Sequence, residues 1–223
     1  MPERKVPLEN DCYYHVVTKS LQNVKLFKQY EDYFRFIDSL DYYNHEDPPI
    51  KYSLFLESDL KTQDLVRYQL KEQKRRFDLI AYSLLPNHLH LLLKQNLNKG
   101  ISKAMQQVKN SYAHFFNIKY KREGPLFRGR FKAVLIETEE QFLHVSRYIH
   151  INIYSSGIAK TIPKLLKYEF SSLPEYISKV KQEICQKKDV FESFNSKDRY
   201  KSFVLDRADY QKSLEVIKKS LKL

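Results

Sequence analysis

The chain has 223 residues, a hydrophobic content of 42% and a formal net charge of +12 at pH 7. An apolar fraction of this size indicates a folded protein, and the length suffices for one substantial core with a smaller appendage. Two cysteines are too few for a disulfide scaffold, and no apolar run approaches the roughly 20 residues that span a bilayer. We therefore expect a cytoplasmic protein, and its positive charge is typical of proteins that bind the phosphate backbone of nucleic acids.

The first part of the chain predicts a strand, a helix and a segment of mixed signals. Residues 12–18 are aromatic and β-branched, which favours a strand. Apolar residues recur at helical spacing over residues 26–43, and two consecutive prolines soon follow. Residues 52–56 could form a short strand, and residues 58–76 have the composition of a charged surface helix.

The central part predicts a hairpin, a helix, a strand and a second helix. Residues 77–85 and 88–94 are apolar runs joined by a Pro-Asn turn. An amphipathic helix follows Gly100, and residues 131–136 favour a strand. Thr138 is a suitable N-cap for a helix that runs to about residue 153.

The order of these elements predicts an α+β fold. Strand, helix, two strands, helix and strand is the order of a ferredoxin-like (RRM-like) antiparallel sheet with helices on one face. From residue 160 the pattern is helical and basic. We expect a catalytic domain at residues 1–158 and a mainly helical C-terminal extension at residues 159–223.

The most informative motif is Pro-Asn-His-Leu-His, which ends in His88 and His90 at the start of a predicted strand. Side chains two residues apart in a strand point to the same face, so the two imidazoles are placed to clamp a metal ion. The alternative is a pair of half-buried histidines on an ordinary sheet face.

A second pair lies on the predicted helix after Thr138. Tyr148 and Asn152 are one helical turn apart, at the border of the apolar stripe formed by Phe142, Val145 and Ile149. A tyrosine can act as a covalent nucleophile toward phosphorus, and an amide oxygen can complete a divalent-metal site. The alternative is that Tyr148, one of 17 tyrosines, has no special role.

Together these motifs resemble those of a known family. Residues 86–92, 124–132 and 147–152 resemble, in the same order, the single-tyrosine transposases with an HUH motif, named insertion-sequence-200-like, and most closely their REP-associated relatives. The resemblance extends from about residue 13 to residue 176. Relatives usually have proline after the Tyr-Ile-His-x-Asn run, whereas this chain has Ile153, so its helix is free to run further.

The resemblance implies a metal-dependent enzyme that cleaves and rejoins single-stranded or hairpin DNA. His88, His90 and Asn152 would be the metal ligands, Tyr148 the nucleophile, and Mg²⁺ or Mn²⁺ the metal. The same resemblance implies action at the nucleoid without a nucleotide cofactor or a membrane, and it leaves monomer and homodimer open.

A basic, aromatic segment is the predicted DNA contact. Arg128, Arg130 and Lys132 alternate with phenylalanines that include Phe131, and Lys109 would extend the same surface. Cations bind phosphate, and phenylalanine rings stack on unpaired bases. The alternative is a solvated turn whose phenylalanines are buried in the core.

Other assignments stay open at this point. A ferredoxin-like sheet could bind single strands without cutting them, and a phosphoesterase with paired His-x-Ser motifs is a third class. Tyr112 is a rival nucleophile, although packing explains its place on an apolar helix stripe. We expect His15 to be a packed or edge histidine, and His150 to contact DNA or nothing.

Overall fold

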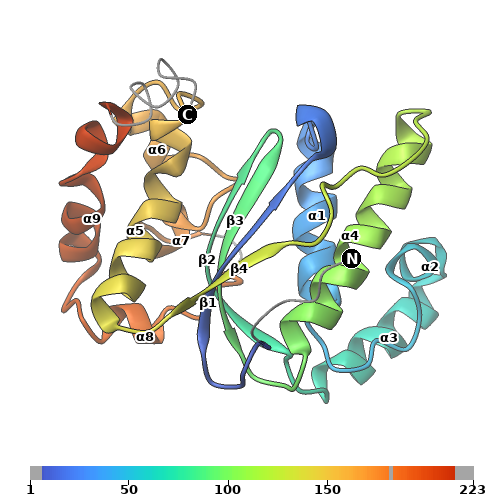
Figure 1. The fold of residues 1–223 in the computed structure, drawn as a ribbon. Helices are drawn as coiled ribbons and strands as arrows, with labels where there is room; N and C mark the ends of the chain where they lie inside the picture. The colour runs from blue at the N-terminus through green and yellow to red at the C-terminus, as the bar shows by residue number, and fades with distance from the viewer. Residues whose placement is uncertain (1–6, 181–182, 214–223) are drawn as a thin grey trace. The chain divides into compact units, whose positions relative to one another are not determined.

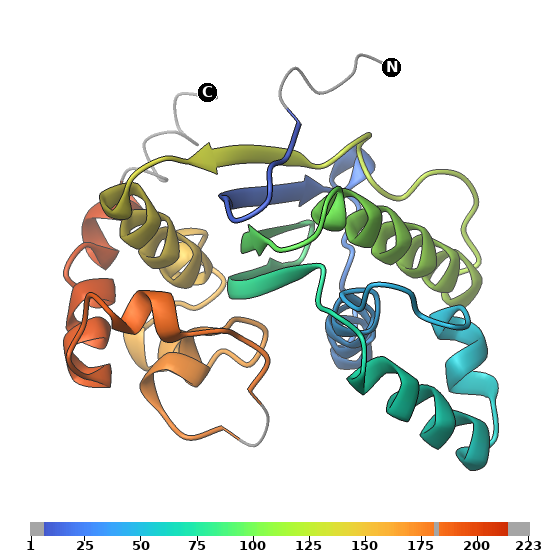
Figure 2. The same ribbon diagram turned by 90° about the horizontal axis from the view of Figure 1, so that it is seen from below.

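The computed structural model describes residues 7–180 and 183–213, and the strands in this part of the chain form a four-stranded antiparallel sheet. The strands are β1 (Tyr13–Lys19), β2 (Phe77–Leu85), β3 (His88–Gln95) and β4 (Lys132–Ile136), in the order β2-β3-β1-β4. Figure 2 shows this order, from β4 in yellow-green to β2 in teal. The predicted α+β class and the hairpin are confirmed.

The helices fill the connections and the C-terminal part (Figure 1). A 3-10 turn, η1 (Leu21–Asn23), follows β1. The helices are α1 (Tyr30–Tyr42), α2 (Tyr52–Glu57), α3 (Leu60–Lys71), α4 (Gly100–Lys119), α5 (Glu139–Ser155), α6 (Ile162–Leu166), α7 (Leu173–Ile177), α8 (Lys188–Phe191) and α9 (Lys197–Leu205). Within the described ranges, none of them combines the length and apolar character needed to cross a bilayer.

Two predictions about the first part of the chain are wrong. Residues 52–56 lie in helix α2 and not in a strand, because Tyr52 and Phe55, three residues apart, are the buried positions. The first helix begins at Tyr30 and not at residue 26. The carboxylate of Asp32 fixes this N-terminus, because it accepts hydrogen bonds from the backbone N–H groups of Lys28 and Gln29.

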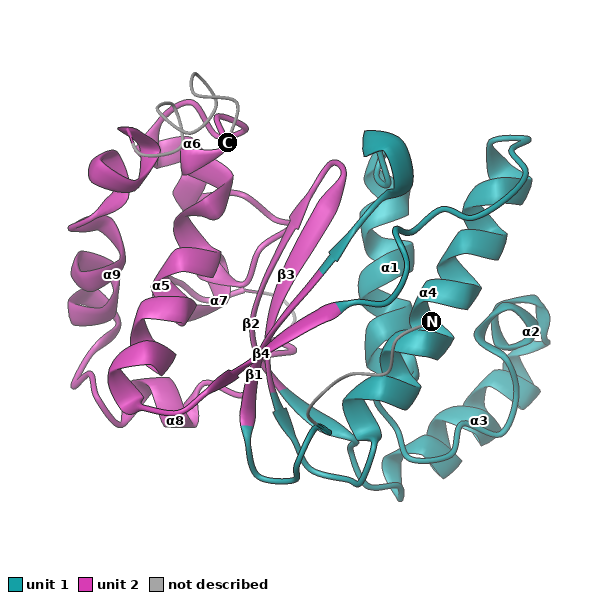
Figure 3. Ribbon diagram, in the orientation of Figure 1, with its two compact units in different colours: residues 1–12, 18–78, 94–131 teal, residues 13–17, 79–93, 132–223 magenta. Residues whose placement is uncertain are grey.

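The chain divides into two compact units (Figure 3). Unit 1 comprises residues 1–12, 18–78 and 94–131, and unit 2 comprises residues 13–17, 79–93 and 132–223. Neither unit has a boundary at residue 158, so the division into a catalytic domain and an extension stays a prediction.

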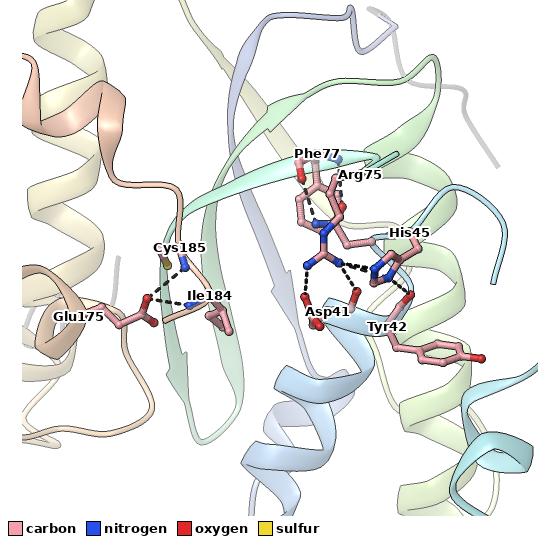
Figure 4. A network of polar contacts seen from close by, with 9 residues as sticks. Asp41, Tyr42, His45, Arg75, Phe77, Glu175, Ile184 and Cys185 are labelled. Atoms are coloured by element: carbon pink, nitrogen blue, oxygen red, sulfur yellow. Dashed lines mark hydrogen bonds and ion pairs between the residues drawn. The ribbon is translucent and has the colours of Figure 1, made fainter. Parts of the chain in front are cut away.

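Unit 1 has an aromatic core between α1 and α4. Tyr112 is fully buried there, with its ring centroid 5.3 Å from that of Phe36, and its hydroxyl donates to the carbonyl of Leu26 at 2.7 Å. At the surface of the same unit, Arg75 forms an ion pair with Asp41 and hydrogen-bonds His45 (Figure 4).

Unit 2 contains the middle of the sheet, α5 and the C-terminal helices. On one face, Leu89, Leu91 and Leu93 of β3 are fully buried. On the other, the ring of Tyr13 packs edge-on against Phe142 of α5, with centroids 4.8 Å apart. Helix α5 therefore covers the face of the sheet that carries Tyr13. The sequence predicts helices on one face only, so this is a second covered face.

The C-terminal part of unit 2 protects the free edge of β2. The backbone N–H of Leu84 donates to Phe170, and that of Gln186 donates to Leu79. Further along, the buried carboxylate of Glu175 accepts hydrogen bonds from the backbone N–H groups of two residues, Ile184 and Cys185 (Figure 4). The bonds of Leu84 and Leu79 satisfy edge groups that would otherwise be open to pairing with another chain.

Candidate active site

The two histidines of the Pro-Asn-His-Leu-His motif lie side by side on β3, within unit 2. Their ring centroids are 5.2 Å apart; His88 is half-buried and His90 is 6% exposed. The strand alternation that points both imidazoles to one face also directs Leu89 into the core on the opposite face. Their proximity therefore follows directly from the local sequence.

A third histidine from β1 joins this pair. The Nε2 atom of His15 lies 2.9 Å from Nδ1 of His90, and the two rings are stacked with centroids 5.1 Å apart. Burial lowers the pKa of His15 to about 4, so the ring is neutral near pH 7. The expectation that His15 is merely packed misses this contact, which depends on β1 and β3 being neighbours in the sheet.

The Nδ1 atoms of both motif histidines have hydrogen-bonding neighbours. Nδ1 of His88 lies 2.7 Å from Oδ1 of Asn87, and Nδ1 of His90 faces His15. A neutral imidazole that donates through Nδ1 keeps its lone pair on Nε2, which is the atom a metal would bind. Partners of this kind orient metal-binding histidines and fix their tautomers.

Helix α5 brings Tyr148 to the same place. The helix begins where expected, with the Thr138 hydroxyl accepting from the Gln141 backbone N–H at 3.2 Å. The half-buried ring of Tyr148 stands edge-on to His90, with centroids 5.5 Å apart, and to His15, with centroids 5.8 Å apart. The predicted nucleophile and the two histidines predicted as metal ligands thus form one cluster within unit 2.

Asn152 lies one turn beyond Tyr148 and is 6% exposed. Helix α5 continues past it to Ser155, as the absence of proline at position 153 allows. In the residues that the structure describes, no group of three or more His, Cys, Asp or Glu side chains is placed to hold a metal ion. The predicted ligand set has two histidines and one amide, Asn152, so it is not a group of that kind. The set stays a prediction.

His150, between Tyr148 and Asn152, has a structural role. The expectation that it contacts DNA or nothing is wrong, because the ring is fully buried. Its Nε2 lies 2.8 Å from the Ser172 hydroxyl, and its Nδ1 lies 2.8 Å from the hydroxyl of Tyr200 on α9. Burial lowers the pKa of His150 to about 3. The C-terminal segment thereby anchors the helix that carries Tyr148.

The predicted DNA-contacting residues divide into two groups. Arg128, Arg130 and Lys132 are exposed, and Phe131 is half-buried. Lys109 instead donates to the carbonyl of Gly129 at 2.6 Å and lies over a buried ring, that of Phe127. Lys109 therefore anchors the loop that precedes Phe131, and a DNA contact by any of these residues stays a prediction.

The rival nucleophile is excluded by burial. The Tyr112 ring is fully buried, its hydroxyl is committed to a backbone carbonyl, and burial raises the pKa of that hydroxyl far above its usual value. A phenol in this position has no route to a phosphate.

Comparison with known proteins supports the resemblance found in the motifs. Residues 54–152 match the family model described as transposase, IS200-like, and the match includes the two motif histidines and ends at Asn152. A search of curated proteins finds no relative. Among solved structures, the chain is similar to a REP-associated tyrosine transposase bound to a REP hairpin. The TM-score is 0.55 at 15% identity, over 83% of this chain and 90% of the other.

The structural likeness establishes a shared fold. The family match contains His88, His90 and Tyr148, and Asn152 is its last residue. The motifs, the fold and the family model point to the same group of proteins. Residues 54–152 of this chain are therefore similar to the IS200-like transposases, and the fold is that of a REP-associated tyrosine transposase.

Proposed function

We propose that this protein is a metal-dependent transposase that cleaves and rejoins single-stranded DNA through a covalent bond to Tyr148. The observation that carries the proposal is the packing of the Tyr148 ring against His90, which is one of the two motif histidines, at a centroid distance of 5.5 Å. A protein that only binds DNA has no need to bring a half-buried phenol beside an imidazole pair. The REP hairpin of the structural relative favours hairpin or palindromic DNA as the substrate.

The residues present fit a divalent ion. His88 and His90 would supply Nε2 atoms, oriented by Asn87 and His15, and Asn152 would supply an amide oxygen. A Mg²⁺ or Mn²⁺ ion held by these ligands would stabilise the charge that develops on a bound phosphate.

The phenolic oxygen of Tyr148 would attack the phosphorus of the scissile linkage. The bond from phosphorus to the 3′ oxygen breaks, and the phenolic proton passes, in the net reaction, to that oxygen. The products are a 5′-phosphotyrosine and a free 3′-hydroxyl. Because the phosphotyrosine ester conserves the energy of the broken linkage, a 3′-hydroxyl reverses the step without a nucleotide cofactor. An enzyme of this kind would act on DNA at the nucleoid, in the cytoplasm.

The proposal is tested by incubating the protein with hairpin DNA labelled at its 3′ end and Mn²⁺, then resolving the products on a denaturing gel. We expect a labelled covalent adduct that disappears in Tyr148→Phe and persists in Tyr68→Phe, a matched change at a tyrosine that is 66% exposed on α3. Binding of DNA without an adduct in the wild type would favour the alternative, a non-catalytic DNA-binding module.

A further inference from the structure

A cavity of about 320 Å³ lies in unit 1, and none of the residues that line it is among those assigned to catalysis. It is formed by the turn that follows β1 and by the loop that precedes β4. Its volume is within the range of pockets that hold small ligands. The residues that line it are Lys19, Ser20, Leu21, Gln22, Asn23 and Arg128.

Backbone pairing places two cations opposite each other at this cavity. Ser20 pairs with Phe127 in an antiparallel bridge, and the N–H of Arg128 donates to the carbonyl of Lys19 at 2.8 Å. This register makes Lys19 and Arg128 direct cross-strand neighbours, and both are exposed. Like charges in such positions repel each other, and none of the lining residues is acidic, so the pair favours an anion between them.

The turn that closes the cavity has an uncommon backbone. Gln22 and Asn23 are consecutive residues in the left-handed region, with φ of 52° and 57°. Such conformations cost about 1 kcal/mol for a residue with a side chain, and they gather at ligand-binding sites. Both residues are exposed and carry amides, which pair with the edges of nucleic-acid bases.

One further polar group at the cavity has no partner in the described structure. The hydroxyl of Ser20 is buried and makes no hydrogen bond. A buried hydroxyl without a partner is costly, and an ordered water or a ligand beside it would satisfy it.

We propose that this cavity binds one nucleotide of a single-stranded DNA segment. Lys19 and Arg128 hold its phosphodiester, and the amides of Gln22 and Asn23 face its base. The inference rests on the proposed function, since it assigns part of the DNA that the enzyme would hold. It adds Lys19, Gln22 and Asn23 to the DNA-binding residues predicted from the sequence.

The test measures binding of a short, fluorescein-labelled, single-stranded oligonucleotide of mixed sequence by anisotropy. We compare Lys19→Gln with Lys25→Gln, an exposed lysine of the same loop that does not line the cavity. One lost phosphate contact lowers the slope of log affinity against log salt by about 0.7, which corresponds to roughly fivefold weaker binding at 0.1 M salt. Lys25→Gln should change the salt slope and the affinity by less than Lys19→Gln does.

A second variant separates a binding role from a folding role. Gln22→Gly accepts a positive φ without strain, so its Tm should rise while its DNA affinity falls about two- to tenfold through loss of the amide. The Tm of Lys19→Gln should also not fall, because the change relieves repulsion with Arg128.

The outcomes distinguish this inference from the proposed function. If Lys19→Gln and Gln22→Gly bind DNA as Lys25→Gln does, while the wild type still forms the Tyr148 adduct, the cavity assignment is overturned alone. If millimolar inorganic phosphate raises the Tm of the wild type but not that of Lys19→Gln, while both proteins bind the oligonucleotide equally, the site is one for a free anion and the nucleotide assignment is overturned. A wild type that binds no DNA overturns both proposals.

Discussion

The buried ring of His150 should make the protein sensitive to acid, and the size of the effect follows from its surroundings. The ring is fully buried and has a pKa lowered to about 3, compared with 6.5 for a histidine in an unfolded chain. A lowered folded-state pKa means that stability is complete above pH 6.5 and is lost as the pH falls below it, because the unfolded chain takes up the proton first. At pH 5 the loss relative to pH 8 is about 2 kcal/mol, from RT ln(1 + 10^(6.5−5)).

The assay is urea unfolding at pH 8 and pH 5 for the wild type, His150→Gln and His144→Gln. The amide of His150→Gln cannot take up a proton, so this variant should lose about 2 kcal/mol less than the wild type between the two pH values. His144 is exposed on the same helix, and its variant should follow the wild type. Other titrating groups contribute equally to all three proteins. Equal losses in the wild type and His150→Gln would refute the reasoning.

Three further predictions concern the site and unit 1. His90→Gln should abolish adduct formation and leave hairpin affinity within about twofold, measured on the same DNA; a parallel loss of both would indicate misfolding instead. His15→Leu removes the 2.9 Å contact to His90 and should weaken Mn²⁺ binding about 10- to 100-fold by calorimetry, and unchanged affinity would contradict its orienting role. Asp32→Asn breaks the 2.7 Å ion pair with the partly exposed Lys119 and should lower the free energy of unfolding by about 2 kcal/mol, whereas a loss below about 0.5 kcal/mol would show that the pair is dispensable.

The parts of the fold and site that depend on local patterns were predictable. Strand alternation alone places His88 and His90 on one face, and helical spacing alone places Asn152 one turn from Tyr148. Thr138 caps α5 as expected because a threonine before two glutamates is a strong helix-start signal.

The parts that depend on which elements become neighbours were not predicted. His15 contacts His90 only because β1 lies beside β3 in the sheet. The side-chain alternation in β1 and the ferredoxin-like strand order together contain enough information to predict this contact. His150 is buried by Ser172 and Tyr200, which are 22 and 50 residues away in the chain. Lys109 donates a hydrogen bond to the carbonyl of Gly129 in a loop, and helical periodicity does not reveal this contact.

The central claim is that Tyr148 becomes covalently bound to DNA, and mass spectrometry of the purified protein–DNA adduct tests it most directly. After digestion of the protein and the DNA, the account predicts a nucleotide mass on the Tyr148 side chain, joined through a 5′ phosphate. A modified residue at any other position, or a 3′ linkage, would contradict it.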